Sequence, residues 1–128
     1  MNLGNHNFFR LFIFFIVIIF LSKNSYSDNL KGNIVKVGAL DKITAKFSEF
    51  DIKVGYDKKF GSINIEIIKC FKRPPEEIPE DFVLMKITDF VDQDNPQIYF
   101  SGWMISSSPS ISPLEHPTYD IWVKDCKI

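Results

Sequence analysis

His116 limits the chemistry that this chain could perform, because the only other histidine is His6, near the start of the chain. A serine hydrolase could be assembled from His116 with Ser107 or Ser108 and Asp120, but the sequence has no Gly-x-Ser-x-Gly nucleophile motif. We therefore expect a structural imidazole that hydrogen-bonds the loop backbone beside Pro117. The alternative is a small hydrolase that acts on cell-wall or lipid material through His116.

Cofactor-dependent chemistry has no visible motif in the sequence. We find no glycine-rich phosphate loop, no His-Glu-x-x-His, no Cys-x-x-Cys and no calcium-binding loop. The chain is therefore expected to carry no metal and no cofactor.

Aromatic residues flank the long serine- and proline-rich segment 106–117. Trp103 precedes it, and Tyr119, Asp120 and Trp122 follow it. In the strands on either side of this segment, apolar residues stand at both odd and even positions and therefore on both faces. These strands are either covered on both faces or leave one face exposed as a binding patch. The candidate partner-binding residues are Trp103, His116, Tyr119, Asp120 and Trp122.

Residues 1–27 have the pattern of a secretory signal peptide. Arg10 precedes an unbroken apolar run over residues 11–21, which is too short for a membrane span of about 20 residues. Ser25 and Ser27 place cleavage before Asp28. The alternative is an uncleaved N-terminal anchor, because Phe8 and Phe9 lengthen the apolar run.

Export decides how the two cysteines are interpreted. Cys70 and Cys126 both follow the leader, and a cysteine pair in an oxidising compartment indicates one disulfide. Two buried free thiols are an alternative. A metal site is another, but it would need His116 and an acid, and the spacing matches no known zinc motif.

Charge and size exclude several classes of protein. The first 27 residues hold Arg10 and Lys23 but no acid, so residues 28–128 carry 13 basic and 16 acidic residues, a net charge of −3. This acidic balance argues against nucleic-acid binding, and 101 residues suffice for one small domain. We expect residues 28–128 to form a single disulfide-linked domain.

Alternation of apolar and polar residues predicts an all-β domain. The pattern predicts strands over residues 43–47, 63–70, 82–88, 98–105 and 119–124, and more weakly over 34–37. A turn or bulge is expected near residues 48–49, where the parity of the apolar positions changes. Six to seven short strands at this spacing indicate a small antiparallel β-sandwich or a barrel-like domain.

Several blocks of sequence resemble a known family. They are Leu40-Asp41-Lys42-Ile43-Thr44-Ala45, Phe100-Ser101-Gly102-Trp103-Met104, Leu114-Glu115-His116-Pro117 and the stretch from Trp122 to Cys126. In this order, across residues 33–127, they are similar to domain of unknown function 2155, a family of small exported alphaproteobacterial proteins. The resemblance implies an envelope location and a paired-cysteine domain, and it supplies no activity or catalytic residues.

Together these patterns predict a periplasmic, non-enzymatic binding or assembly module. Its expected partner is an unidentified envelope protein or other envelope component, bound around Trp103, His116, Tyr119 and Trp122. Membrane contact is expected only through the leader, if that segment is not cleaved.

Overall fold

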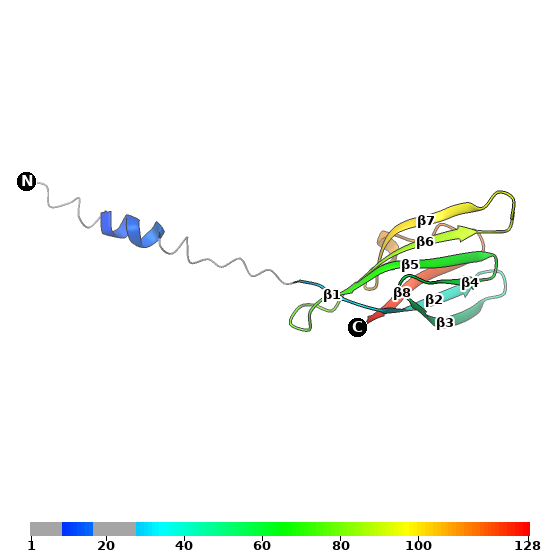
Figure 1. Cartoon of the computed structure of the whole chain (residues 1–128), viewed down its shortest axis with the longest axis horizontal. Helices are drawn as coiled ribbons and strands as arrows, with labels where there is room; N and C mark the ends of the chain where they lie inside the picture. The colour runs from blue at the N-terminus through cyan, green and yellow to red at the C-terminus, as the bar shows by residue number, and fades with distance from the viewer. Residues whose placement is uncertain (1–8, 17–27) are drawn as a thin grey trace, which may run out of the picture.

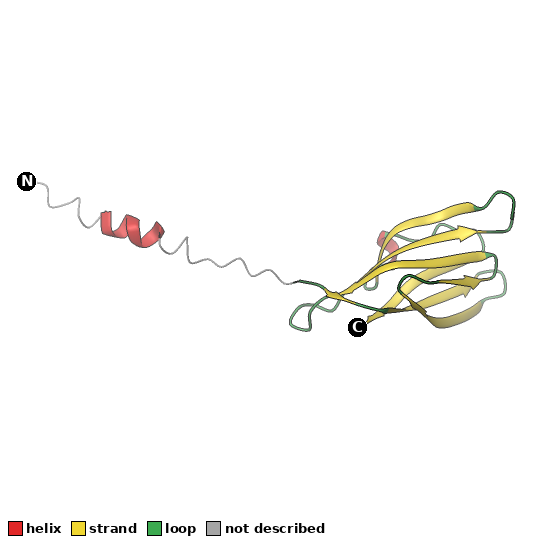
Figure 2. Ribbon diagram, viewed as in Figure 1, coloured by secondary structure: helices red, strands yellow, loops and turns green. Residues whose placement is uncertain are grey.

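The computed structural model describes residues 9–16, which are helical, and residues 28–128, which contain the strands (Figures 1 and 2). The predicted cleavage site at residues 25–27 and most of the predicted leader lie outside the described residues. Within the described ranges, no helix has the length and apolar character needed to cross a bilayer.

Two antiparallel sheets form the two layers in Figure 1. The five-stranded sheet has the order β1-β5-β6-β7, with β4 also paired to β5, and the three-stranded sheet has the order β3-β2-β8. This confirms the predicted all-β, sandwich-like fold. The elements are β1 (Leu30–Lys31), β2 (Ile34–Asp41), β3 (Lys46–Lys53), β4 (Asp57–Phe60), β5 (Ile63–Lys72), β6 (Asp81–Asp89), β7 (Gln97–Ile105), the 3₁₀ helix η1 (Pro109–Ile111) and β8 (Tyr119–Lys127).

The core lies between the sheets and follows directly from the alternation in sequence. Successive side chains of a strand point to opposite faces, so every second residue of β6 faces inward, and so does every second residue of β5 up to the bulge between Ile67 and Lys69. The apolar inward residues are fully buried, and residues of β2 and β8 cover them from the other layer. The buried core includes Val35, Val37, Ala39, Ile63, Ile65, Ile67, Val83, Met85, Ile87, Ile121 and Val123.

The strand predicted over residues 43–47 is wrong for residues 43–45, because β3 begins only at Lys46. Residues 42–45 form the turn between β2 and β3, where Asp41 Oδ1 accepts the backbone N–H groups of Ile43 at 2.9 Å and Thr44 at 3.1 Å. Ala45 has a positive φ of 55°, and Ile43 is 77 % exposed. The parity change marks no bulge, because β3 pairs with β2 in continuous register from Lys46 to Lys53.

The chain enters the domain by linking the two sheets. It pairs with β5 in β1 and then continues as β2 in the other sheet. Gly32 N–H donates to the Cys70 carbonyl at 2.9 Å, and Asn33 N–H donates to the Lys127 carbonyl at 2.8 Å. In Figure 1, the C-terminus and the segment leading into β1 therefore lie at the same end of the sandwich.

Candidate functional site

Cys70 and Cys126 are placed at bonding distance across the two sheets, one on β5 and the other on β8. Their Cα atoms are 6.0 Å apart, as in ordinary disulfides, and both residues are buried. Gly32 packs directly against the sulfur atoms, and a Cβ atom at this position would lie less than 3 Å from each of them. The close approach of the backbone therefore requires glycine here.

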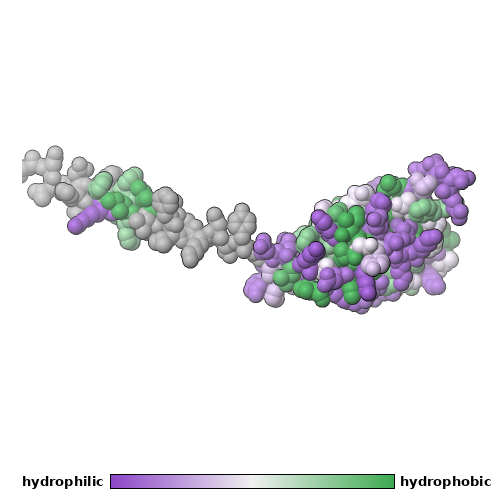
Figure 3. Space-filling view, viewed as in Figure 1, coloured by the Kyte–Doolittle hydropathy of each residue, from purple (hydrophilic) through white to green (hydrophobic). Residues whose placement is uncertain are grey.

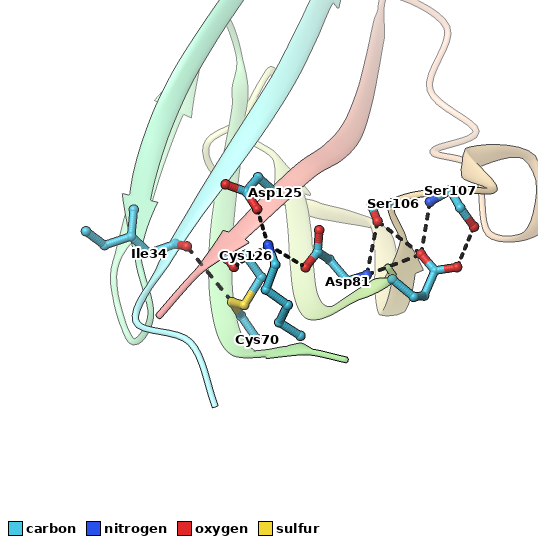
Figure 4. A network of polar contacts seen from close by, with 9 residues as sticks. Ile34, Cys70, Asp81, Ser106, Ser107, Asp125 and Cys126 are labelled. Atoms are coloured by element: carbon cyan, nitrogen blue, oxygen red, sulfur yellow. Dashed lines mark hydrogen bonds and ion pairs between the residues drawn. A yellow bond between two sulfur atoms is a disulfide. The ribbon is translucent and has the colours of Figure 1, made fainter. Parts of the chain in front are cut away.

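Lys72, next to the disulfide, links the same two strands through Asp125 and Cys126, both of which are labelled in Figure 4. Lys72 Nζ lies 2.5 Å from Asp125 Oδ1 and 3.2 Å from the Cys126 carbonyl. The hydrogen bond to Asp125 is the main reason why the pKa of Lys72 is raised. Asp81 Oδ1 lies 3.3 Å from Lys72 Nζ, and this ion pair also raises the pKa of Lys72.

Glu80 holds the start of the long loop that follows β7 by bonding Ser106 and Ser107, which Figure 4 labels. Its Oε1 accepts the Ser106 hydroxyl and the Ser107 backbone N–H, each at 3.0 Å, and its Oε2 accepts the Ser107 hydroxyl. Burial alone would raise the pKa of Glu80, but these hydrogen bonds outweigh it and lower the pKa. Ser107, one of the possible nucleophiles, thus has its hydroxyl bonded to Glu80.

His116 is buried at the end of the sandwich, and both of its ring nitrogens are hydrogen-bonded. Nδ1 accepts the backbone N–H groups of Thr118 and Tyr119, each at 3.1 Å. Nε2 lies 3.1 Å from Asp89 Oδ2. Since Nδ1 accepts hydrogen bonds from two backbone N–H groups, the proton of the neutral ring lies on Nε2, which donates it in a hydrogen bond to the Asp89 carboxylate.

The surroundings of His116 fix the ring from both sides. The Tyr99 ring lies 4.3 Å from it and the Tyr119 ring 5.1 Å, measured between centroids. Asp89 is also buried, which raises its pKa, but hydrogen bonds from Ser62, His116 and the Val91 backbone bring the pKa below its ordinary value. The whole arrangement holds the loop before β8 against the end of β6.

Acid is expected to destabilise the protein through these carboxylates. Both Asp89 and Glu80 have a lower pKa in the folded state than in the unfolded state, so their ionised forms stabilise the fold. This contribution to the free energy of unfolding is present above their ordinary pKa values of 3.8 and 4.5, and it is lost as the pH falls through their folded-state pKa values. Urea unfolding at a series of pH values from about 7 to about 3 measures this loss.

The control is a variant that carries Asp89→Asn and Glu80→Gln. It should be less stable than the wild type near neutral pH, and its stability should fall less steeply in acid. Equal acid sensitivity in the two proteins would show that other carboxylates control the transition.

An apolar cluster lies on the outer face of the five-stranded sheet. We call it the Trp103 face and define it as Phe71, Phe82, Leu84, Trp103 and Ile105. The register places Phe71 opposite Phe82, Phe82 opposite Ile105, and Leu84 opposite Trp103, so all five point outward together. The rings of Phe71 and Trp103 are 5.9 Å apart, and Trp103 is 42 % exposed.

A shallow hollow of about 320 Å³ opens on the Trp103 face, lined by Asn29, Phe71, Phe82 and Trp103. Figure 3 shows apolar patches between polar side chains on the visible surface of the domain.

Trp122 and Asp120 lie on the outer face of the other sheet. The Trp122 ring covers Gly38, where a Cβ atom would lie 2.5 Å from the ring, and stacks on Phe47 at 5.7 Å. Asp120 Oδ1 is 3.4 Å from Lys42 Nζ. Both residues also border a shallow groove of about 350 Å³ against Pro109 and Pro113 of the long loop.

The five candidate partner-binding residues thus fall into three separate places. His116 and Tyr119 lie together at the end of the sandwich, Trp122 and Asp120 lie outside the three-stranded sheet, and Trp103 lies outside the other sheet. Neither tryptophan belongs to the buried core. Across residues 9–16 and 28–128, no group of three His, Cys, Asp or Glu side chains is placed to hold a metal ion.

Sequence reasoning did not single out Asp89, Tyr99 or Phe71. Asp89 did give a signal, because it has the same inward parity as Val83, Met85 and Ile87 on β6. A carboxylate at an inward position needs a hydrogen-bonding partner, and His116 was an available donor. Phe71 could be assigned to a face only once the register of β5 and β6 was known.

The fold and these contacts define a small disulfide-linked β-sandwich domain. A family model described as "Uncharacterized protein conserved in bacteria (DUF2155)" matches residues 35–126, and the chain belongs to this family. An uncharacterized protein of Rickettsia prowazekii (strain Madrid E) is 41 % identical over 120 residues, which cover 86 % of this chain and 77 % of that protein. No solved structure matches the chain.

Proposed function

We propose that the chain is an exported, periplasmic domain that binds another component of the cell envelope and is not an enzyme. The apolar run and the cleavage sequence before Asp28 support export. The cysteine pair at bonding distance suits an oxidising compartment.

The Trp103 face is the observation that best supports a binding function. On this face Trp103 is exposed and Phe71, Phe82, Leu84 and Ile105 are half-buried, and contiguous apolar patches on a protein surface mark interaction sites. Tryptophan in particular is enriched where interfaces derive most of their binding energy. The face is therefore the best candidate for partner contact.

The hydrolase alternative finds less support in the geometry. A general base needs a free ring nitrogen within reach of its nucleophile. Both nitrogens of His116 are already bonded, to Asp89 and to the backbone of Thr118 and Tyr119. The Ser107 hydroxyl pairs with Glu80 and with Ser108.

Site-specific photo-crosslinking in cells tests the proposal. A photoreactive amino acid in place of Trp103 should give an adduct with an envelope component, and the same amino acid in place of Asp51, on the outer face of the other sheet, should not. The protein recovered without reductant should begin at Asp28 and carry the disulfide. A cytoplasmic protein with free thiols would contradict export, and no adduct at position 103 would contradict binding through this face.

A further inference from the structure

The charges around the Trp103 face differ in sign from those of the domain as a whole. On this face of the sheet, Lys31 of β1, Lys69 of β5 and Lys86 of β6 point outward together with Glu66 of β5. The edge strand β4 adds one charge of each sign, Asp57 and Lys59. Glu66 pairs with Lys86 at 2.9 Å, whereas Lys31 and Lys69 have no acidic partner within the described part of the chain. The face is therefore cationic in a domain whose net charge is −3.

Arg73 lies at the border of this face. Its guanidinium is 5.7 Å from the centre of the Phe82 ring and 3.8 Å from Glu77 Oε2. Aromatic and aliphatic side chains bordered by two lysines without an acidic partner among the described residues, Lys31 and Lys69, match the interface of a bilayer with anionic lipids. There tryptophan lies at headgroup level and basic side chains contact the negative surface.

The leader joins the domain beside this face. Asn29 lines the hollow together with Phe71, Phe82 and Trp103. The apolar run ends at Leu21, and residues 22–27 can span at most about 20 Å. While the leader is attached and inserted in a membrane, the Trp103 face is held within reach of the same bilayer.

From the apolar cluster, its cationic border and this tether, we infer that the Trp103 face docks on an anionic membrane surface. This inference rests on the proposed function and names the envelope component as lipid. It extends the expected membrane contact from the leader to the folded domain. Trp103 and its neighbours would enter the headgroup region, and Lys31 and Lys69 would meet the lipid phosphates.

The two tryptophans make the inference directly testable, because they lie outside opposite sheets. The variants Trp122→Phe and Trp103→Phe, recovered from cells, each leave one tryptophan as the fluorescent reporter. With vesicles of phosphatidylcholine and phosphatidylglycerol, Trp103 should shift its emission to the blue and be quenched by brominated lipid. Trp122 should show neither effect, whether or not the leader has been removed.

The contribution of charge is measured with a matched pair of substitutions. Lys69→Gln should lower partitioning onto the anionic vesicles about five-fold. Lys53→Gln removes the same charge from the outer face of the other sheet and should leave partitioning unchanged. Vesicles of phosphatidylcholine alone should bind the wild type more weakly than the anionic vesicles do.

Three outcomes would overturn the inference. Trp103 emission could stay unchanged with anionic vesicles, or both tryptophans could respond equally, which would indicate non-specific adsorption. The third outcome is a photo-adduct at position 103 with a protein and no response to lipid. That result would support the proposed binding function and refute the membrane as its target.

Discussion

The variant that carries Cys70→Ala and Cys126→Ala is expected to lose about 4 kcal/mol of its free energy of unfolding. The disulfide joins two cysteines that are 56 residues apart in the sequence and lie on strands of different sheets. Its removal therefore frees a long loop in the unfolded chain. Domains of this size have total stabilities of about 5–15 kcal/mol. Urea unfolding of the oxidised wild type and the variant measures the difference.

Reduced wild-type protein is the control for the cysteine variant. It retains the sulfur atoms and their packing, so its stability should lie close to that of the double variant and below that of the oxidised protein. A loss smaller than about 1 kcal/mol on reduction would show that the unfolded chain is already constrained without the disulfide.

His116→Phe is expected to destabilise the domain by about 3 kcal/mol or more. The substitution keeps an aromatic ring in the buried space but leaves Asp89 and the backbone N–H groups of Thr118 and Tyr119 without their partner. Buried polar groups that lose a hydrogen bond cost much more than exposed ones. Urea unfolding near neutral pH provides the measurement.

The neighbouring exposed residue supplies the comparison for His116. Glu115→Ala changes a side chain in the same loop that makes none of these contacts, and its effect should stay within about 0.5 kcal/mol. If His116→Phe were as mild as Glu115→Ala, the polar contacts of the imidazole would not stabilise the fold. Its burial would then be a matter of packing alone.

Much of the fold could be predicted because alternation reports directly which face of a strand is buried. The expected strands over residues 63–70, 82–88, 98–105 and 119–124 correspond to β5, β6, β7 and β8. The turn between β2 and β3 was missed because Ile43 and Ala45 continue an alternating pattern with Phe47 by coincidence. Asp41 was the available clue, since aspartate often bonds the backbone two residues ahead in turns.

The candidate site was only partly predictable for a different reason. Long-range pairs depend on register, which no local pattern specifies: His116 meets Asp89, 27 residues away, and Trp103 meets Phe71 across β6. Sequence proximity grouped Trp103 with Trp122, although the two strands belong to different sheets. The long connection between β7 and β8 is what separates them.

The way in which the chain enters the domain has a mechanical consequence. A pull on residue 28 first acts on β1, whose two residues, Leu30 and Lys31, can peel from β5 one after the other. The load then reaches β2, the central strand of its sheet, which is bonded along its length to β3 and β8. Those ladders resist in shear, with many hydrogen bonds loaded at once, so a domain pulled from its N-terminal side should keep its fold after the two residues of β1 have detached.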